Sequence, residues 1–313
     1  MKSRHRLSTF VLSGWVLFGA LGCAAPQTQT IISSRDALPN FAEIESVPFF
    51  PQEQYFCGPA SLATALTWAR LPVMPDDIAA EIYTPGREGT FAPDIVAAAR
   101  RRGRVAIEMN ELSDLLRELA AGHPVIVFQN LSLRVIPQWH FAVAIGYDLN
   151  ERQIILRSGT HRRLLVPLDA FERTWRRADY WALVVLPPDG VPAIPDTGRW
   201  LAAAAGLERV NRLLEAELAY ETFLTRWPGN RLAQMGKANA LFAMNRFDAA
   251  ELSYRDVVAG DPLMADAWNN LAYALYRQGK RAEAVDAAAR AVAIAGDKNT
   301  EYADTLKDVS QGR

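Results

Sequence analysis

The sequence contains few residues that bind metals or form crosslinks. Its 313 residues include 2 cysteines and 4 histidines, and these do not have the spacing of a metal-binding motif. Positive and negative charges nearly cancel, leaving a net charge of -1. This balance argues against a nucleic-acid-binding protein and against attachment to membranes through a basic patch. Because half of the residues are hydrophobic, we expect a globular protein, and its length is enough for two domains. We expect no metal and no cofactor.

The N-terminus lacks an apolar run long enough for a comfortable membrane span. Its short apolar run, from Phe10 to Leu21, follows three basic residues and predicts an export signal. The run ends in small residues before Cys23, which resembles the bacterial lipobox, although that motif usually has leucine where Ala20 stands. We therefore predict a lipoprotein signal over residues 1–23 with a lipid on Cys23. The alternative is an ordinary cleaved signal and a soluble product.

Residues 24–43 are expected to form a flexible tether between that lipid and the first domain. Ala24, rather than an aspartate, follows Cys23. By resemblance to lipoprotein sorting in double-membraned bacteria, this predicts an exported protein attached to the outer membrane and facing the periplasm. The membrane would then be a partner through the N-terminal lipid alone.

The second cysteine, Cys57, has no disulfide partner if Cys23 carries a lipid, and a lone thiol in an exported protein indicates reactivity. Gly58 and Pro59 follow it, and apolar residues then recur at helical spacing, so Cys57 is expected at the start of a helix. Unpaired N–H groups and the helix dipole favour a thiolate there. This position suits a catalytic nucleophile. The alternative is a small apolar residue at a helix start.

The first domain is predicted to be α+β over residues 44–187. Helical patterns occupy its first half, and apolar runs typical of strands follow, at 125–128, 140–147, 153–158 and 180–186. Residues 148–152 are expected to form the turn of a hairpin. A proline-rich stretch at 188–196 predicts a semi-rigid linker.

Beyond the linker, residues 197–313 repeat with a period of 34, seen in Ala216, Ala250 and Ala284 and in Trp200 and Trp268 at twice that spacing. This is the period of the tetratricopeptide repeat, a helix-turn-helix unit. We predict repeats at 197–230, 231–264 and 265–298, followed by a cap helix from Glu301. The alternative is a generic helical bundle. The repeats are expected to bind a protein partner or the substrate.

A thiol nucleophile needs a base, and among the four histidines His140 is the best candidate, because it opens a strand after a polar loop. A third group should orient the imidazole. Asp148 lies on the same strand but is too far, since eight strand residues span roughly 26 Å. Ser158 on the hairpin partner returns alongside His140. Gln52 could donate to an oxyanion together with the Cys57 N–H, and otherwise it is a solvated loop residue.

Together these residues resemble the papain-like bacteriocin-processing peptidases, which cut leader peptides after double glycine. The resemblance covers about residues 44–187 and depends on Gln52, on the Cys57-Gly58-Pro59-Ala60 element and on the strand that begins with His140 and Phe141. It implies that Cys57 is the nucleophile, His140 the base and Gln52 the oxyanion residue. The sequence departs from the family at Ser158-Gly159, where Asp-Pro is usual, and at Phe56, where an acidic residue is often found.

The fold class we predict is an α+β papain-like cysteine peptidase domain followed by an all-α tetratricopeptide-repeat domain. The first functional hypothesis is a lipid-anchored cysteine peptidase that acts on a peptide or protein through an acyl-enzyme. The second is a non-catalytic peptide-binding lipoprotein on the same fold, favoured by Ser158 in place of an acidic residue. The third is a thiol acyltransferase, which shares the chemistry but uses another acceptor.

Overall fold

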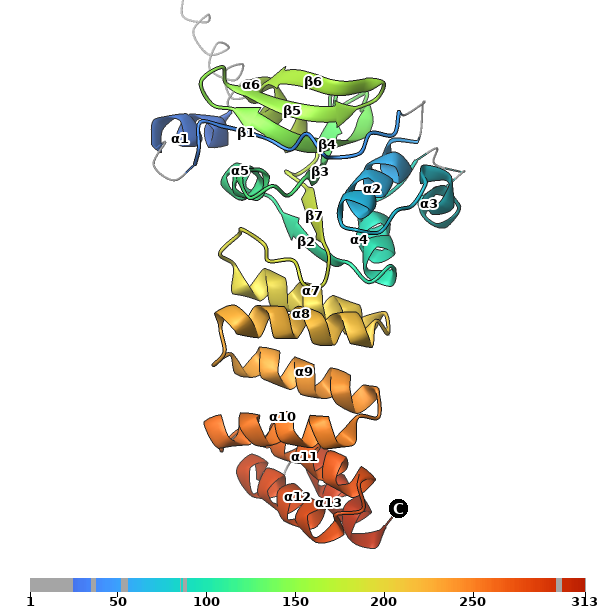
Figure 1. Ribbon diagram of the computed structural model, residues 1–313, viewed down its shortest axis with the longest axis vertical. Coiled ribbons are helices and arrows are strands. Elements are labelled where there is room, and N and C mark those ends of the chain that lie inside the picture. Colours follow the sequence, from blue (N-terminus) through green and yellow to red (C-terminus); the bar gives the residue numbers. More distant parts are fainter. Residues whose placement is uncertain are drawn as a thin grey trace, which may run out of the picture.

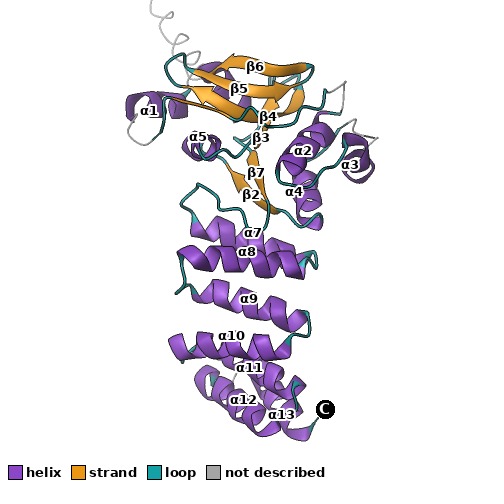
Figure 2. Cartoon of the chain, viewed as in Figure 1, coloured by secondary structure: helices purple, strands orange, loops and turns teal. Residues whose placement is uncertain are grey.

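The computed structural model describes residues 25–34, 38–51, 56–84, 86, 89–296 and 300–312. Within these ranges, the chain forms an α+β domain followed by a stack of helices, which confirms the predicted order of the two fold types (Figure 1). The two parts lie one after the other along the long axis (Figure 2). None of the helices in the described ranges combines the length and the hydropathy needed to cross a membrane.

The α+β domain is built on a seven-stranded sheet in which every pair of neighbouring strands is antiparallel. The order is β2-β7-β3-β4-β5-β6, and β1 also pairs with β4. The hairpin predicted around residues 148–152 joins β4 to β5. The strands are β1 (Phe41–Glu43), β2 (Val105–Met109), β3 (Val125–Asn130), β4 (Trp139–Asp148), β5 (Gln153–Ser158), β6 (His161–Pro167) and β7 (Ala182–Leu186).

Successive residues of a strand point to opposite faces of the sheet, and in this sheet both sets of side chains are largely apolar. Helices therefore cover both faces. On β4, Phe141 and Val143 pack into the cluster that contains helix α2, whereas Ala142 and Ala144 pack into the cluster on the opposite face. The first face is covered by α2 (Cys57–Trp68), α3 (Pro75–Ile82) and α4 (Ala92–Arg101). The opposite face is covered by α5 (Leu112–Ala120) and α6 (Leu168–Arg176).

The prediction of a flexible tether over residues 24–43 is wrong for the residues that the structure describes. Pro26–Ser34 forms helix α1, and Phe41–Glu43 forms strand β1 of the sheet. The carboxylate of Glu172 on α6 is fully buried and accepts hydrogen bonds from the N–H groups of Gln27 (3.0 Å) and Thr28 (2.7 Å). A carboxylate at a helix N-terminus satisfies unpaired N–H groups and the helix dipole. A residue 145 positions away along the chain therefore fixes α1 to the domain.

The C-terminal helices form antiparallel pairs, α7 (Thr197–Arg209) with α8 (Leu213–Arg226), α9 (Arg231–Ala243) with α10 (Phe247–Gly260), and α11 (Ala265–Arg277) with α12 (Arg281–Ala295). The first helices of the pairs begin at 197, 231 and 265, the 34-residue spacing seen in the sequence. Asp196 and Asn230 cap α7 and α9 by accepting an N–H three residues on. Helix α13 (Thr300–Gln311) follows the last pair.

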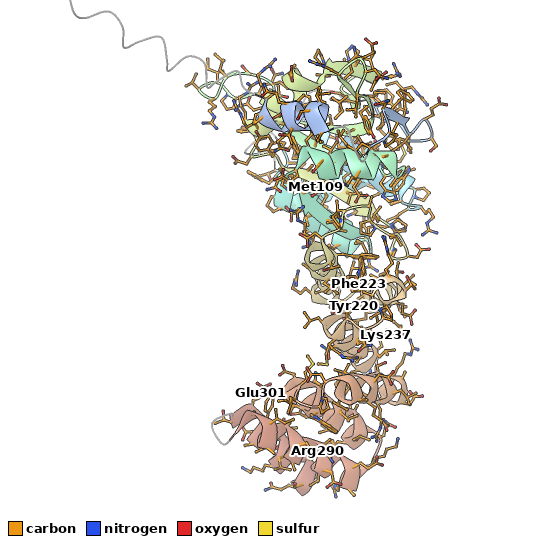
Figure 3. All side chains as sticks on the ribbon, turned by 90° about the vertical axis from the view of Figure 1, so that its left-hand side faces the viewer. Met109, Tyr220, Phe223, Lys237, Arg290 and Glu301 are labelled. Atoms are coloured by element: carbon orange, nitrogen blue, oxygen red, sulfur yellow. The ribbon has the colours of Figure 1, made fainter. Side chains whose placement is uncertain are left out.

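The two parts share one hydrophobic core rather than meeting at a separate interface. Trp200 of α7 and Phe223 of α8 belong to the same buried cluster as residues of β2 and β7. In Figure 3, Phe223 and Tyr220 lie in the narrow middle of the molecule, between Met109 of β2 and Lys237 of the second helix pair. The first helix pair is therefore packed as a continuation of the α+β domain.

The predicted linker is also fixed by a buried carboxylate. Oε1 of Glu118, on α5, accepts the N–H groups of Ala193 (2.8 Å) and Ile194 (3.0 Å), and Oε2 lies 2.6 Å from Nδ1 of His123. Glu118 is fully buried. Because a buried carboxylate needs partners for each oxygen, these bonds hold the linker on the domain surface.

Candidate active site

Cys57 is the first residue of helix α2, as the sequence predicted. Gly58 and Pro59 form the rest of the first turn, where proline is tolerated because its missing N–H would have no partner there. Gly58 is also required by space, since a Cβ on this residue would lie 2.6 Å from Cβ of Thr90. The thiol is therefore placed by a helix start that packs closely against the segment before α4.

The sulfur of Cys57 lies against strand β4. The backbone N–H of Phe141 donates to it, and the N–H groups of Gly58 and Cys57 lie near it at the start of α2. Burial raises the pKa of the Cys57 thiol, and these three N–H groups lower it by less. The pKa of Cys57 is raised overall, so its side chain is a thiol rather than a thiolate at rest.

His140, the residue before Phe141, is the second residue of β4. Its Nε2 lies 2.8 Å from Oγ of Ser158, at the end of β5. The predicted neighbourhood of His140 and Ser158 is thus present in the structure, brought about by the β4–β5 hairpin. Burial lowers the pKa of His140 below its ordinary range. With Nε2 held by the serine, Nδ1 is the ring nitrogen that remains to take up a proton.

The resting charge state differs from the one expected from the sequence. Proximity to a helix N-terminus favoured a thiolate at Cys57, but burial raises the pKa of the thiol and lowers that of His140. Both shifts disfavour charge, so the thiol of Cys57 and the imidazole of His140 are each neutral at rest. The helix position is right, while the strength of desolvation depends on packing under β4 that the local sequence does not reveal.

This charge state predicts how fast Cys57 reacts with iodoacetamide at different pH values. Because only the thiolate reacts, and the pKa is raised, the rate at pH 6 to 7 should be lower than that of an exposed cysteine. The rate should then climb as the pH passes above the ordinary thiol value of about 8.5. Peptide mass mapping reports modification of Cys57 separately from Cys23. A fast reaction at pH 6 would contradict the neutral pair and indicate a thiolate–imidazolium pair.

The other sequence-based candidates have different outcomes. Gln52 and Cys23 lie outside the described residues. Asp148 is at the far end of β4, where its carboxylate accepts the N–H groups of Asn150 and Glu151 in the turn. His123 pairs with Glu118, and His161 is exposed on β6. Of the described histidines, His140 is thus the one that directly precedes Phe141, the residue whose N–H contacts Cys57.

Comparisons with known proteins agree with the two-part architecture. Residues 44–182 match the model of the Peptidase C39 like family, and residues 201–252 and 235–299 match a tetratricopeptide-repeat model. The chain carries a C39-like peptidase domain followed by tetratricopeptide repeats. The predicted resemblance to bacteriocin-processing peptidases and the predicted fold class are therefore confirmed.

Solved structures similar to this chain include both kinds of domain. A Bacillus anthracis protein described as a C39-like peptidase is 20% identical, covers 47% of this chain and 98% of its own, and has a TM-score of 0.42. The peptidase domain of Streptococcus ComA, a bifunctional ABC transporter, is 21% identical over 45% of this chain and 98% of its own, with a TM-score of 0.38. The first tetratricopeptide domain of Spaghetti (RPAP3), solved with an HSP90 peptide, is 21% identical over 36% and 89%, with a TM-score of 0.35. Among curated proteins, no match was found.

The C39-like domain contains a buried arginine that the sequence reading missed. Arg157 of β5 precedes Ser158 and is 5% exposed. Its guanidinium donates to the carbonyl oxygens of Glu45 (3.3 Å) and Val47 (3.0 Å), on the segment that leads towards α2. Arg157 therefore links the strand that ends at Ser158 to that segment. A charged residue inside the apolar strand 153–158 was the signal that could have revealed it.

The tetratricopeptide repeats contain a pocket of about 180 Å³. Oδ1 of Asn239 accepts from the Tyr254 hydroxyl (2.7 Å) and from Nδ2 of Asn270 (3.1 Å), which leaves the amide N–H groups of Asn239 without a hydrogen bond described in the structure. Phe242 and Tyr273 complete the lining. The lining suits an uncharged polar or aromatic group.

No cluster of three or more His, Cys, Asp or Glu side chains in the described ranges is arranged to hold a metal ion.

Proposed function

We propose that this protein is a cysteine peptidase in which Cys57 attacks a peptide carbonyl with the help of His140. The observation that carries the proposal is the position of the sulfur at the start of α2. There it accepts the N–H of Phe141, the residue directly after His140. This position supports a pairing of the thiol with His140, whose Nε2 lies 2.8 Å from Oγ of Ser158. In the proposal, Cys57, His140 and Ser158 are the nucleophile, base and orienting group that acyl transfer requires.

In the proposed mechanism, His140 accepts the thiol proton as the sulfur forms a bond to the substrate carbonyl carbon. The N–H of Cys57, at the unpaired start of α2, donates to the resulting oxyanion, and the Gln52 carboxamide is proposed as the second donor. His140 then gives its proton to the leaving amine, and the C–N bond breaks. Water, deprotonated by His140, hydrolyses the acyl-enzyme and restores the thiol.

A second function, peptide binding without catalysis, is favoured by two features of the site. The shifts of the Cys57 and His140 pKa values both favour neutral groups, so the resting thiol is less nucleophilic than a thiolate. The hydroxyl of Ser158 stabilises an imidazolium less than a carboxylate would. The peptidase proposal therefore depends on His140 removing the proton during attack.

The two functions are separated by digesting unfolded casein with the full-length chain and with its Cys57→Ala variant. The peptidase proposal predicts new peptide termini, measured by mass spectrometry, that appear with the wild type and are absent with the variant. The matched control is His161→Ala, which changes an exposed histidine of β6 and should leave the rate unchanged. If the wild type and Cys57→Ala give the same amount of product, cleavage does not depend on Cys57, and peptide binding would remain as the function.

The proposal also includes the envelope location and the role of the repeats. The lipobox-like sequence before Cys23 supports lipidation and attachment to the outer membrane facing the periplasm. The pocket formed by Asn239, Phe242 and Tyr273 supports binding of a protein partner or of the substrate by the repeats. Labelling cells with a fatty-acid precursor tests the anchor. Wild-type protein should be labelled and Cys23→Ala should not, and an unlabelled wild type would disprove lipidation.

A further inference from the structure

An apolar hairpin stands beside His140. Residues 131–138 join β3 to β4, and we call them the apolar hairpin. Leu133, Val135 and Ile136 are 66%, 84% and 71% exposed, and Trp139, at the start of β4, is 51% exposed. Clustered exposure of large apolar side chains is unusual on a soluble domain and marks an interaction surface.

The apolar hairpin has a fixed conformation. The N–H of Leu131 donates to the carbonyl of Gln138 (2.9 Å), and the N–H of Ile136 donates to that of Leu133 (3.2 Å). At its base, Oδ1 of the buried Asn130 accepts the N–H groups of Ser132 (3.1 Å) and Gln138 (3.0 Å). Its apolar side chains are therefore held out in a defined arrangement, which lowers the ordering cost of binding.

Stacked aromatic rings lead from the hairpin towards the nucleophile. Trp139 stacks on Phe128 with ring centroids 5.2 Å apart, and Phe128 stacks on Phe141 at 4.3 Å. The N–H of Phe141 donates to the sulfur of Cys57. Three stacked rings thus link the hairpin to Phe141, whose backbone N–H contacts the reacting atom, on the sheet face that carries α2.

We propose that the apolar hairpin and Trp139 bind an apolar segment of the peptide substrate, close to the bond that is cleaved. This inference rests on the proposed peptidase function. A bilayer would touch only the exposed tip, whereas a peptide bound to the tip and to Trp139 also lies next to His140, the residue that follows Trp139 on β4. Val135 and His140 are five positions apart along the chain, a distance of at most about 18 Å when fully extended, so the segment lies within about five substrate residues of the scissile bond.

The test compares two triple variants of exposed residues. The first is Leu133→Ser/Val135→Ser/Ile136→Ser in the apolar hairpin. The matched control is Leu214→Ser/Leu218→Ser/Leu252→Ser on α8 and α10, where the leucines are 67%, 40% and 67% exposed. Because all six side chains are exposed, both variants should fold and keep the wild-type rate of Cys57 alkylation.

Binding is measured first, in full-length protein carrying Cys57→Ala so that no cleavage occurs. The probe is a fluorescein-labelled ten-residue peptide of alternating leucine and serine, followed by fluorescence anisotropy. The hairpin variant should raise Kd at least tenfold, and the control should not change it. Equal Kd values in both variants would overturn the proposal. So would a hairpin variant that loses only its binding to phosphatidylglycerol vesicles or only its self-association.

Cleavage is measured second, with Cys57 intact and a peptide library made from a digested proteome. Bonds cut by the wild type should have leucine, isoleucine, valine or phenylalanine enriched within five positions, and the hairpin variant should lose this enrichment. Unchanged enrichment in the hairpin variant would contradict the proposal. If the wild type cuts no peptide, the peptidase function fails, and the binding measurement alone decides whether the hairpin binds peptides.

Discussion

Replacing His140 with alanine should lower kcat/KM for peptide hydrolysis by about a thousandfold. General-base assistance contributes typically 10²–10⁴-fold, and here it is needed in full because burial raises the pKa of the Cys57 thiol. Without a base, attack depends on the small thiolate fraction present at neutral pH. The measurement is the initial rate on a peptide cleaved by the wild type, with His161→Ala as the control. A His140→Ala variant within tenfold of the wild-type rate would exclude His140 as the base.

Substitutions of Ser158 refine the same prediction. Ser158→Ala removes the 2.8 Å hydrogen bond to His140 and should cost about tenfold, the value of one such bond. Ser158→Asp places a carboxylate there, which favours the imidazolium and should raise the pKa of His140. The acid limb of the pH–rate profile should then move to higher pH than in the wild type. An unmoved acid limb would show that Ser158 does not contact the working form of the imidazole.

Replacing Trp200 with alanine should destabilise the α+β domain as well as the repeats, by about 3–5 kcal/mol. Trp200 is 1% exposed and belongs to the cluster that includes β2 and β7. Its ring lies 5.2 Å from that of Phe223 and 5.6 Å from that of Trp227. The loss is measured by urea unfolding with two probes: helix circular dichroism for the whole chain and protection of Cys57 from alkylation for the α+β domain.

The control for Trp200 is Trp268→Ala, the equivalent position two repeats later. Trp268 packs against the separate cluster of the second and third repeats and does not contact the sheet cluster. Its substitution should shift the helix signal and leave the unfolding midpoint of Cys57 protection unchanged. If Trp200→Ala also left Cys57 protection unchanged, the shared core would not couple the two parts.

The regular features of this fold could be predicted because they repeat along the chain. The 34-residue spacing of Ala216, Ala250 and Ala284 located helices that pack on their sequence neighbours. Helix α1 could not be predicted in this way, because its sequence has few apolar residues. It is held instead by Glu172, 144 residues away from Thr28. Contacts of that range leave no local pattern.

The candidate site shows the same division between local and distant causes. The helix start at Cys57 follows from Gly58 and Pro59, and the approach of Ser158 to His140 follows from hairpin geometry. The raised pKa of Cys57 comes from burial beneath β4, which depends on tertiary packing. The apolar hairpin was also missed, because the sequence does not reveal that Leu133, Val135 and Ile136 remain exposed.

The central claim, that Cys57 forms an acyl-enzyme with peptide substrates, is tested most directly by intact-mass analysis. The full-length chain is mixed with a peptide that it cleaves and is quenched in acid within milliseconds to seconds. We predict a mass increase equal to the N-terminal product less one water, mapped to Cys57 and absent in Cys57→Ala. Accumulation should slow in His140→Ala. Cleavage without any adduct on Cys57, or with equal speed in Cys57→Ala, would contradict the proposed mechanism.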